Sequence, residues 1–291
     1  WFIMKKFALL VVSLFAAGSA LYARKPAPVI PDFIHAAYSV ESLLSEAELT
    51  NPGYDAFQFI YLMATPEWAG LDFDRPQDAV DAYATQFDYL KQGGKMALAP
   101  SMIEKAHAAG ARILLCFGGQ QEFLPLLENP DRIAKFVGYM VRLVEKNGYD
   151  GIDMDWEITL DKELHARMMA LLRERFDELS ERTGRYYYLT TALSIDHEYD
   201  RALVDWINIM SYDMCDGVWG STPSHNTSME RMRSKLEHWK VFDKRKLCLG
   251  LANYGFYYKG LKPGQKADGP LRDYGSYITY KEFLPRLANG W

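Results

Sequence analysis

The sequence has little cysteine and no excess of positive charge, and each shortage excludes a class of protein. Its 291 residues include three cysteines, with no C-x-x-C pair and no His/Cys cluster. That pattern predicts neither a disulfide framework nor a metal site. The formal net charge of −5 gives no reason to expect a nucleic-acid partner. No G-x-G-x-x-G follows any predicted strand, which removes a nucleotide-binding fold.

Residues 1–23 have the composition of a secretory signal peptide. Lys5 and Lys6 form a short basic region, an apolar run covers residues 7–17, and small residues up to Ala20 follow. The apolar run is too short to span a bilayer comfortably. We therefore expect cleavage after Ala20 or Ala23, export to the periplasm or outside the cell, and no membrane span afterwards.

The remaining chain, residues 24–291, alternates between strand-like and helix-like segments. Helices are predicted from capping residues and apolar periodicity at 101–110, 130–147, 161–183 and 228–239. Between them lie apolar, β-branched or aromatic runs at 33–40, 57–64, 112–117, 148–157, 186–194, 206–212 and 246–254. Such alternation indicates an α/β fold with a parallel sheet. Seven repeats favour a (β/α)8 TIM barrel over an open doubly wound sheet.

The most informative stretch is residues 149–157, the fourth predicted strand. Side chains on a strand alternate between two faces, so Asp153, Asp155 and Glu157 share one face and large apolar residues share the other. We expect the acids to point into the lumen of the barrel. Three acids this close, partly removed from water, cannot all stay ionised, so at least one pKa must rise. A carboxyl group that keeps its proton near neutral pH is what a general acid needs.

A calcium loop and an exposed acidic strand edge are the alternatives for this stretch. An EF-hand loop places polar or glycine residues after its acids and a bidentate glutamate at position 12. Here Ile152, Met154 and Trp156 lie between and beside the acids. These apolar side chains also argue against an exposed edge, so catalysis is the favoured interpretation.

Residues 150–157, D-G-I-D-M-D-W-E, resemble the D-G-x-D-x-D-W-E signature of glycoside hydrolase family 18, the chitinases and endo-β-N-acetylglucosaminidases. The resemblance implies a retaining hydrolysis in which the acetamido oxygen of the substrate is the nucleophile, without cofactor or metal. Glu157 would protonate the leaving oxygen and then act as a base on water. Asp155 would orient the acetamido group and stabilise the oxazolinium ring. Asp153 would hydrogen-bond to Asp155 and help to set its protonation.

Residues 112–119 and 205–213 resemble two further strands of the same family. The first resembles a strand that ends S-x-G-G, with Cys116 in place of the serine, and its Gly118 and Gly119 would let the backbone approach a ligand.

The second resembles a strand that ends M-T-Y-D. By this resemblance, Tyr212 would donate its hydroxyl to the acetamido group of the substrate. Met210 would line the pocket below it, and Asp213 would bind substrate at the end of the strand.

The remaining predicted contacts come from separate parts of the chain. Residues 250–256 resemble the family's seventh strand, G-x-P-x-Y-G-R, in which Tyr254 would bind substrate, although Phe256 stands in place of the arginine. Trp219 resembles a loop tryptophan that stacks on a sugar face, and Tyr38 falls near a tyrosine of the family's first strand.

Chitin or another oligosaccharide that contains N-acetylglucosamine is the expected partner, bound by a monomer. Two alternatives stay open: an endo-β-N-acetylglucosaminidase that acts on the chitobiose core of N-glycans, and a non-catalytic protein that binds chitooligosaccharides. Members of the family continue with a small α+β insertion, of which residues 256–291 would be the start, and then with an eighth strand. We therefore expect a TIM barrel without its eighth strand and without most of the insertion, as in a gene fragment.

Overall fold

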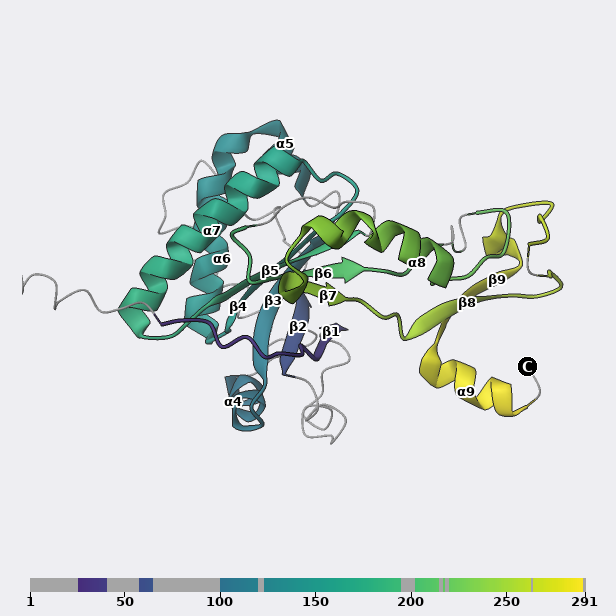
Figure 1. The fold of residues 1–291 in the computed structure, drawn as a ribbon, viewed down its shortest axis with the longest axis horizontal. Helices are drawn as coiled ribbons and strands as arrows, with labels where there is room; N and C mark the ends of the chain where they lie inside the picture. The colour runs from purple at the N-terminus through teal and green to yellow at the C-terminus, as the bar shows by residue number, and fades with distance from the viewer. Residues whose placement is uncertain are drawn as a thin grey trace, which may run out of the picture.

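The computed structural model describes residues 26–40, 58–64, 100–119, 123–194, 202–214, 217, 220–262 and 264–289. Within them, seven parallel strands pair in chain order and form one curled sheet, half of a barrel (Figure 1). The strands are β1 (Ala36–Val40), β2 (Phe59–Ala64), β3 (Arg112–Gly119), β4 (Gly151–Trp156), β5 (Tyr188–Ser194), β6 (Trp206–Met210) and β7 (Leu247–Leu249). The predicted parallel α/β fold with seven strands is confirmed.

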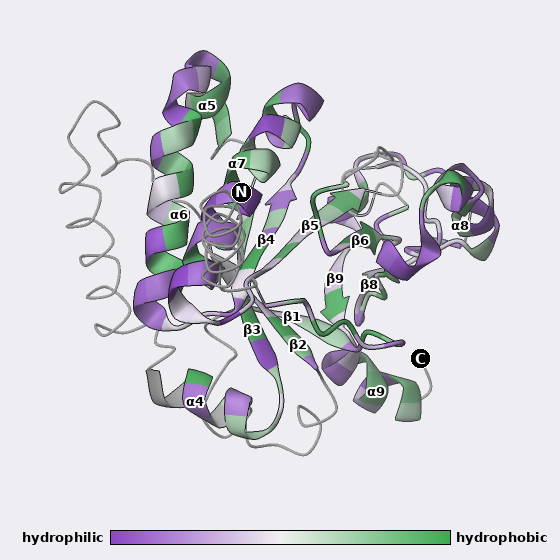
Figure 2. Cartoon of the chain, turned by 60° about the vertical axis from the view of Figure 1, so that its left-hand side comes forward, coloured by the Kyte–Doolittle hydropathy of each residue, from purple (hydrophilic) through white to green (hydrophobic). Residues whose placement is uncertain are grey.

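The described α-helices are α4 (Pro100–Ala108), α5 (Leu124–Glu128), α6 (Ile133–Asn147), α7 (Lys162–Thr183), α8 (Met229–Leu236) and α9 (Tyr280–Ala288). Helices α4 to α8 lie between strands of the sheet in the chain, whereas α9 follows the last described strand and packs against it. In Figure 2, hydrophobic and hydrophilic stretches alternate along α6, as its predicted periodicity requires. Among the described residues, no helix combines the length and hydrophobicity that crossing a membrane requires.

The helix ends follow the sequence signals. The side chain of Asp161 accepts the backbone N–H of Leu164 at 2.8 Å and begins α7, which ends at Gly184 in the left-handed conformation. Gly148 ends α6 in the same way. The predicted helix over 228–239 is shorter: α8 ends at Leu236, and a 3₁₀ turn covers His238–Val241.

The predicted seventh strand, residues 246–254, is wrong in its second half. Strand β7 ends at Leu249, and the chain then leaves the sheet. Tyr254 begins β8 (Tyr254–Tyr258), which pairs antiparallel with β9 (Gly275–Thr279) in a separate two-stranded hairpin. The reason is the backbone partner, because residues 254–258 form their strand hydrogen bonds with β9 and not with the seven-stranded sheet. The apolar run at 246–254 therefore contributes its first part to one sheet and its last residue to the other.

Two buried aspartates that precede their strands tie neighbouring strands together. Asp150, before β4, accepts the backbone N–H of Ile113 in β3 at 2.9 Å. Asp205, before β6, accepts the backbone N–H of Leu189 in β5 at 2.8 Å. Arg185 pairs with Asp150 at 3.0 Å, so this buried carboxylate is neutralised as well as hydrogen-bonded. Both aspartates therefore stabilise the amino end of the sheet. The row of Asp153, Asp155 and Glu157, called the acid row below, lies toward the opposite end.

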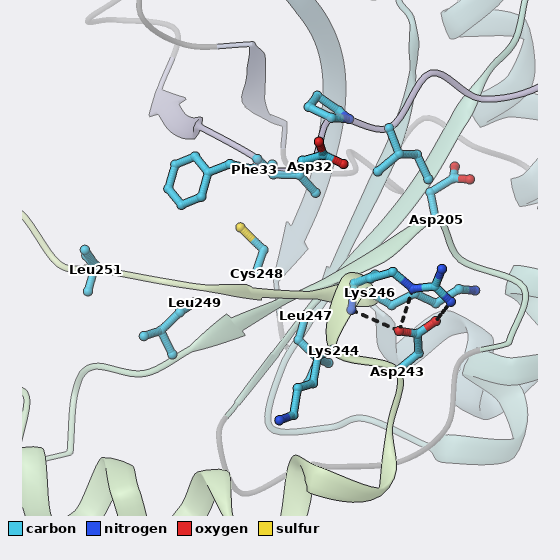
Figure 3. A pocket seen from close by; sticks show the side chains of 14 residues that line it. Asp32, Phe33, Asp205, Asp243, Lys244, Lys246, Leu247, Cys248, Leu249 and Leu251 are labelled. Carbon is cyan, nitrogen blue, oxygen red and sulfur yellow. Dashed lines mark hydrogen bonds and ion pairs between the residues drawn. The ribbon is translucent and has the colours of Figure 1, made fainter.

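The two edges of the sheet, β1 and β7, are not paired with each other. A cavity of about 800 Å³ lies between β7 and the segment that precedes β1. Figure 3 shows Phe33 of that segment on one side of the cavity and Cys248 and Leu249 of β7 on the other. Its charged residues each lie before the start of a strand: Asp32 before β1, Asp205 before β6, and residues 243–246 before β7. The cavity therefore extends toward the amino ends of the strands.

Gly151 provides a test of the strand packing. A Cβ at this position would lie 2.0 Å from the backbone oxygen of Tyr188, and its φ of +157° also disfavours a side chain. We expect Gly151→Ala to lower the free energy of unfolding by about 2 kcal/mol or more, because backbone rather than a side chain would have to move.

Gly255→Ala is the matched control, because nothing lies within 4 Å of the added Cβ there. Urea unfolding monitored by circular dichroism measures both variants. Equal midpoints for the two variants would contradict the packing at Gly151.

Candidate active site

The acid row lies at the carboxyl end of β4, on the face of the sheet that lines the lumen. Asp153 is fully buried, Asp155 is 7% exposed, and Glu157, just beyond the strand, is half-buried. The apolar residues between them, Ile152, Met154 and Trp156, are buried in the core that the helices cover. The predicted alternation of this strand is therefore confirmed.

Asp153 accepts four hydrogen bonds from four other strands. Its Oδ2 accepts the hydroxyl of Tyr38 in β1 at 2.9 Å and the thiol of Cys116 in β3 at 3.3 Å. Its Oδ1 accepts the side-chain amide of Asn208 in β6 at 3.2 Å and the hydroxyl of Thr190 in β5. Burial raises the pKa of Asp153, and these hydrogen bonds oppose the rise.

The expected hydrogen bond between Asp153 and Asp155 is not among the contacts of either carboxyl group, and it stays a prediction. The oxygens of Asp153 are already satisfied by donors from other strands, and residues two apart on a strand lie roughly 6.6 Å apart at the backbone. Asp155 Oδ1 is buried without a hydrogen-bond partner among the described residues. Asp153 therefore acts on Asp155 through its charge.

The pKa of Asp155 is raised strongly enough to keep this carboxyl group protonated at neutral pH. Burial raises its pKa to about 8, assisted first by the charge of Glu157 and then by that of Asp153. The pKa of Glu157 is also raised, by burial and then by the charge of Asp213. The sequence predicted at least one raised pKa, and the structure gives a protonated Asp155 at neutral pH beside a half-buried Glu157 whose proton is retained more strongly than in water.

The backbone after β4 fixes the direction of Glu157. Its N–H donates to the carbonyl oxygen of Gly119 at 3.0 Å, which extends the pairing with β3 by one residue. The indole N–H of Trp156 donates to Thr159 at 2.8 Å, and its ring stacks on Phe123 at 4.8 Å between centroids. These contacts hold the strand end while Glu157 faces the open side of the lumen.

A second group of side chains lies across from the acid row, at the end of β6. Asp213 adopts a positive φ of 52°, and its N–H donates to the side-chain oxygen of Asn226 at 2.8 Å. The hydroxyl of Tyr254 donates to Asp213 Oδ2 at 2.6 Å. The amide of Asn226 in turn donates to the carbonyl oxygen of Tyr254 at 3.1 Å. Asn226 thereby holds Asp213 and Tyr254 together.

Tyr212 joins the two groups. Burial raises its pKa, and the charge of Asp155 is the next cause, which places the phenol close to the acid row. Its ring lies 6.0 Å from that of Tyr254. A Cβ on Gly250 would lie 2.9 Å from the Tyr212 ring, so only glycine leaves room for this position. Met210, on the same face at the end of β6, is partly buried.

The structure brings most of the predicted site residues together at one end of the sheet. Gly118 of β3 lies opposite Asp155 of β4. Gly119 accepts the backbone N–H of Glu157 and so holds the end of β4. Tyr38 contacts Asp153, so it supports the acid row from within. Trp219 lies outside the described residues.

Sequence reasoning missed three residues: Thr190, Asn208 and Asn226. Alternation along β6 gives the signal for Asn208, since it lies two residues before Met210 on the same face. The sequence has no signal for Thr190, because its partner Asp153 lies 37 residues away in the chain. Asn226 lies in the loop after the sixth strand that resembles the family's loop with Trp219, but its hydrogen-bond partners could not be predicted.

The described part of the chain contains no group of three or more His, Cys, Asp or Glu side chains that could hold a metal ion. Cys116 and Cys248 are free thiols, and Cys215 lies outside the described residues. The arrangement offers acid–base chemistry: a half-buried carboxyl group at the open side, a buried carboxyl group that holds a proton, and tyrosine hydroxyls opposite them.

Comparison with known proteins gives a family and several relatives. The model described as Glycosyl hydrolases family 18 matches residues 67–285. Over 264 residues the chain is 25% identical to Probable chitinase 2 of Drosophila melanogaster, covering 77% of this chain and 53% of that protein. Over 114 residues it is 30% identical to Chitinase A1 of Niallia circulans, covering 32% of this chain and 16% of that protein. The chain thus spans about half or less of the length of these relatives.

Solved structures resemble the fold. A chitinase from Cycas revoluta in complex with (GlcNAc)3 aligns with a TM-score of 0.64 at 17% identity, over 89% of this chain and 81% of that one. A chitinase from Trichuris suis aligns with a TM-score of 0.65 at 20% identity, over 89% and 78%. The likeness confirms the TIM-barrel-like architecture.

The raised pKa of Asp155 predicts how stability depends on pH. Between about pH 4 and pH 8 the folded state holds a proton on Asp155 that the unfolded chain has released, so this group's contribution to stability falls as pH rises. Asp155→Asn cannot titrate. We therefore expect the free energy of unfolding of Asp155→Asn, minus that of the unchanged protein, to increase between pH 5 and pH 8. The increase should be on the order of 1 kcal/mol per pH unit.

Urea midpoints at the two pH values measure this difference. Asp131→Asn is the control for the loss of a carboxyl group, because the Asp131 side chain is 94% exposed. A flat difference for Asp155→Asn would contradict the raised pKa.

Proposed function

This chain belongs to glycosyl hydrolase family 18, and on that premise we propose that it hydrolyses β-1,4 glycosidic bonds next to N-acetylglucosamine. Chitin or a related oligosaccharide is the proposed substrate, in keeping with the neighbouring structure that holds (GlcNAc)3. One observation carries the proposal: Asp153, Asp155 and Glu157 form a row of carboxyl groups with raised pKa values at the carboxyl ends of the strands, where barrel enzymes have their active sites.

Glu157 is the proposed general acid. Its raised pKa keeps a proton available, and its position beyond β4 leaves it the least buried of the three acids. Glu157 would protonate the glycosidic oxygen as the bond to the anomeric carbon breaks. It would then take a proton from the water that attacks that carbon, so that the acid is regenerated.

The nucleophile in this proposal is the acetamido oxygen of the substrate, because family 18 is an exception to the scheme of two catalytic carboxylates. Asp155 would orient the acetamido group. As positive charge develops on the oxazolinium ring, it would lower the pKa of the adjacent Asp155. The proton of Asp155 would pass to Asp153, the neighbouring acid on the same face, whose pKa is also raised. The ionised Asp155 carboxylate would then stabilise the ring.

Tyr212 would donate its hydroxyl to the acetamido oxygen and hold it at the anomeric carbon. Burial and the charge of Asp155 both raise the pKa of Tyr212, so the phenol stays a hydrogen-bond donor at any working pH. Two attacks on the anomeric carbon from opposite faces, first by the acetamido oxygen and then by water, give retention of configuration.

Substitution of the proposed acid tests the proposal. We expect Glu157→Gln to reduce hydrolysis of a fluorogenic di-N-acetylchitobioside by roughly 10²- to 10⁴-fold, since the amide can neither donate nor accept the proton. Glu163→Gln, at an exposed position in the first turn of α7, should leave the rate unchanged. Circular dichroism of both variants checks that they fold.

The other outcomes separate the alternatives. Full activity in Glu157→Gln would overturn the assignment of the acid. Binding of chitooligosaccharide without cleavage by the unchanged protein would point to a non-catalytic binding protein. Release of N-glycans at the chitobiose core, without cleavage of chitooligosaccharides, would point to an endo-β-N-acetylglucosaminidase.

Residues 1–23 support the further proposal that the protein is exported. Their basic start, apolar run and small residues match a secretory signal peptide. Expressed in a bacterial host, the protein should appear in the periplasm or medium, shortened to begin at residue 21 or 24, as mass spectrometry would measure. Replacing Lys5 and Lys6 with glutamate should reduce export. Uncleaved protein that stays inside the cell would contradict the proposal.

A further inference from the structure

We propose that Tyr277, on the β8–β9 hairpin, is a sugar-stacking residue that forms an additional subsite for an N-acetylhexosamine ring beside the acid row. The inference rests on the proposed function and specifies how the same site would bind longer chains.

The hairpin presents a continuous aromatic face. Residues directly opposite in an antiparallel pair share a face, and Phe256 of β8 lies opposite Tyr277 of β9. Alternation places Tyr254 on the same face, two residues before Phe256. The Tyr277 ring lies 5.1 Å from that of Tyr254, at an interplanar angle of 32°. Phe256 stands edge-on to both, at 89° to Tyr254 and 76° to Tyr277.

This aromatic face is continuous with the candidate active site. The hydroxyl of Tyr254 donates to Asp213, and its ring lies 6.0 Å from that of Tyr212. Tyr254 therefore lies between Tyr212, next to the acid row, and Tyr277, farther out. The charge of Asp213 is a secondary cause, after burial, of the raised pKa of Tyr277, which places the outer ring near the same carboxylate. In Figure 1 the hairpin lies beyond the ends of β6 and β7.

The three rings differ in exposure, and the difference assigns their roles. Tyr277 is 49% exposed. Phe256 is partly buried, and a Cβ on Gly217 would lie 3.1 Å from its ring, so the loop after β6 covers it. Phe256 and Tyr254 thus support Tyr277 from below and from one side, while part of the Tyr277 ring stays open to solvent. A rigid, partly exposed ring suits the apolar C–H face of a sugar.

The departure from the family pattern supports this role. Phe256 stands where the G-x-P-x-Y-G-R pattern has arginine, so this wall offers aromatic rings in place of a cation. Stacking does not require charge, and we expect the subsite to bind a neutral sugar ring with little dependence on salt.

The experiment compares substrates of two lengths. Tyr277→Ala should lower kcat/KM for chitopentaose by roughly tenfold, mainly through KM, because stacking and burial of one ring are lost. Hydrolysis of the shorter fluorogenic di-N-acetylchitobioside should not change. Tyr277→Phe should retain the activity of the unchanged protein on both substrates, because the ring remains.

Tyr280→Ala is the matched control. Tyr280 is 59% exposed and lies directly after β9, and it lines a pocket with Phe283 of α9 to which Tyr277 does not contribute. This variant should leave both substrates unaffected. Equal losses on both substrates in Tyr277→Ala would assign a purely structural role to Tyr277, and no loss on either would also overturn the inference.

A failure of the proposed function would give a different result. If the unchanged protein cleaves neither substrate, the hydrolase proposal fails, and binding of chitopentaose decides the inference. Isothermal titration calorimetry should then show weaker binding by Tyr277→Ala than by Tyr280→Ala. Equal affinities, or no binding by the unchanged protein, would overturn the subsite.

Discussion

The structure depends on the burial of one carboxyl group, that of Asp153, in the lumen of a curled sheet. An ionised carboxylate there costs several kcal/mol unless donors surround it. Strands β1, β3, β5 and β6 each contribute one donor, and together they match the four acceptor positions of a carboxylate. These donors reach the same carboxyl group only because the sheet curls. The curvature of the sheet therefore determines the hydrogen bonds that stabilise the charge of Asp153.

The sequence predicted the features that depend on local pattern. Alternation along β4 placed three acids on one face, and Asp161 and Gly184 marked the ends of α7, because period and capping are properties of a short segment. Features that depend on distant partners could not be predicted. The break between β7 and β8 depends on β9, and Asn226 acts on residues 13 and 28 positions away in the chain.

The surroundings of Asp153 could not be predicted for the same reason. The expected hydrogen bond from Asp153 to Asp155 considered β4 alone, whereas donors from four other strands contact the oxygens of Asp153. The resemblance to a family correctly indicated the fold. The residues that depart from its pattern, Cys116 and Phe256, show where this chain builds the same region differently: Cys116 supports Asp153 through a thiol, and Phe256 supports an aromatic wall.

The hydrogen bonds around Asp153 also constrain how the chain folds. Tyr38 and Asp153 are 115 residues apart, and Asn208 and Tyr38 are 170 apart, yet all three meet in one network. Contacts of such long range form late, because loop closure must precede them. The acid row therefore reaches its final electrostatic state only after β1 and β6 have joined the sheet. A chain in which β1 and β6 had not yet joined the sheet would carry all three acids and still lack two of the hydrogen bonds that lower the pKa of Asp153.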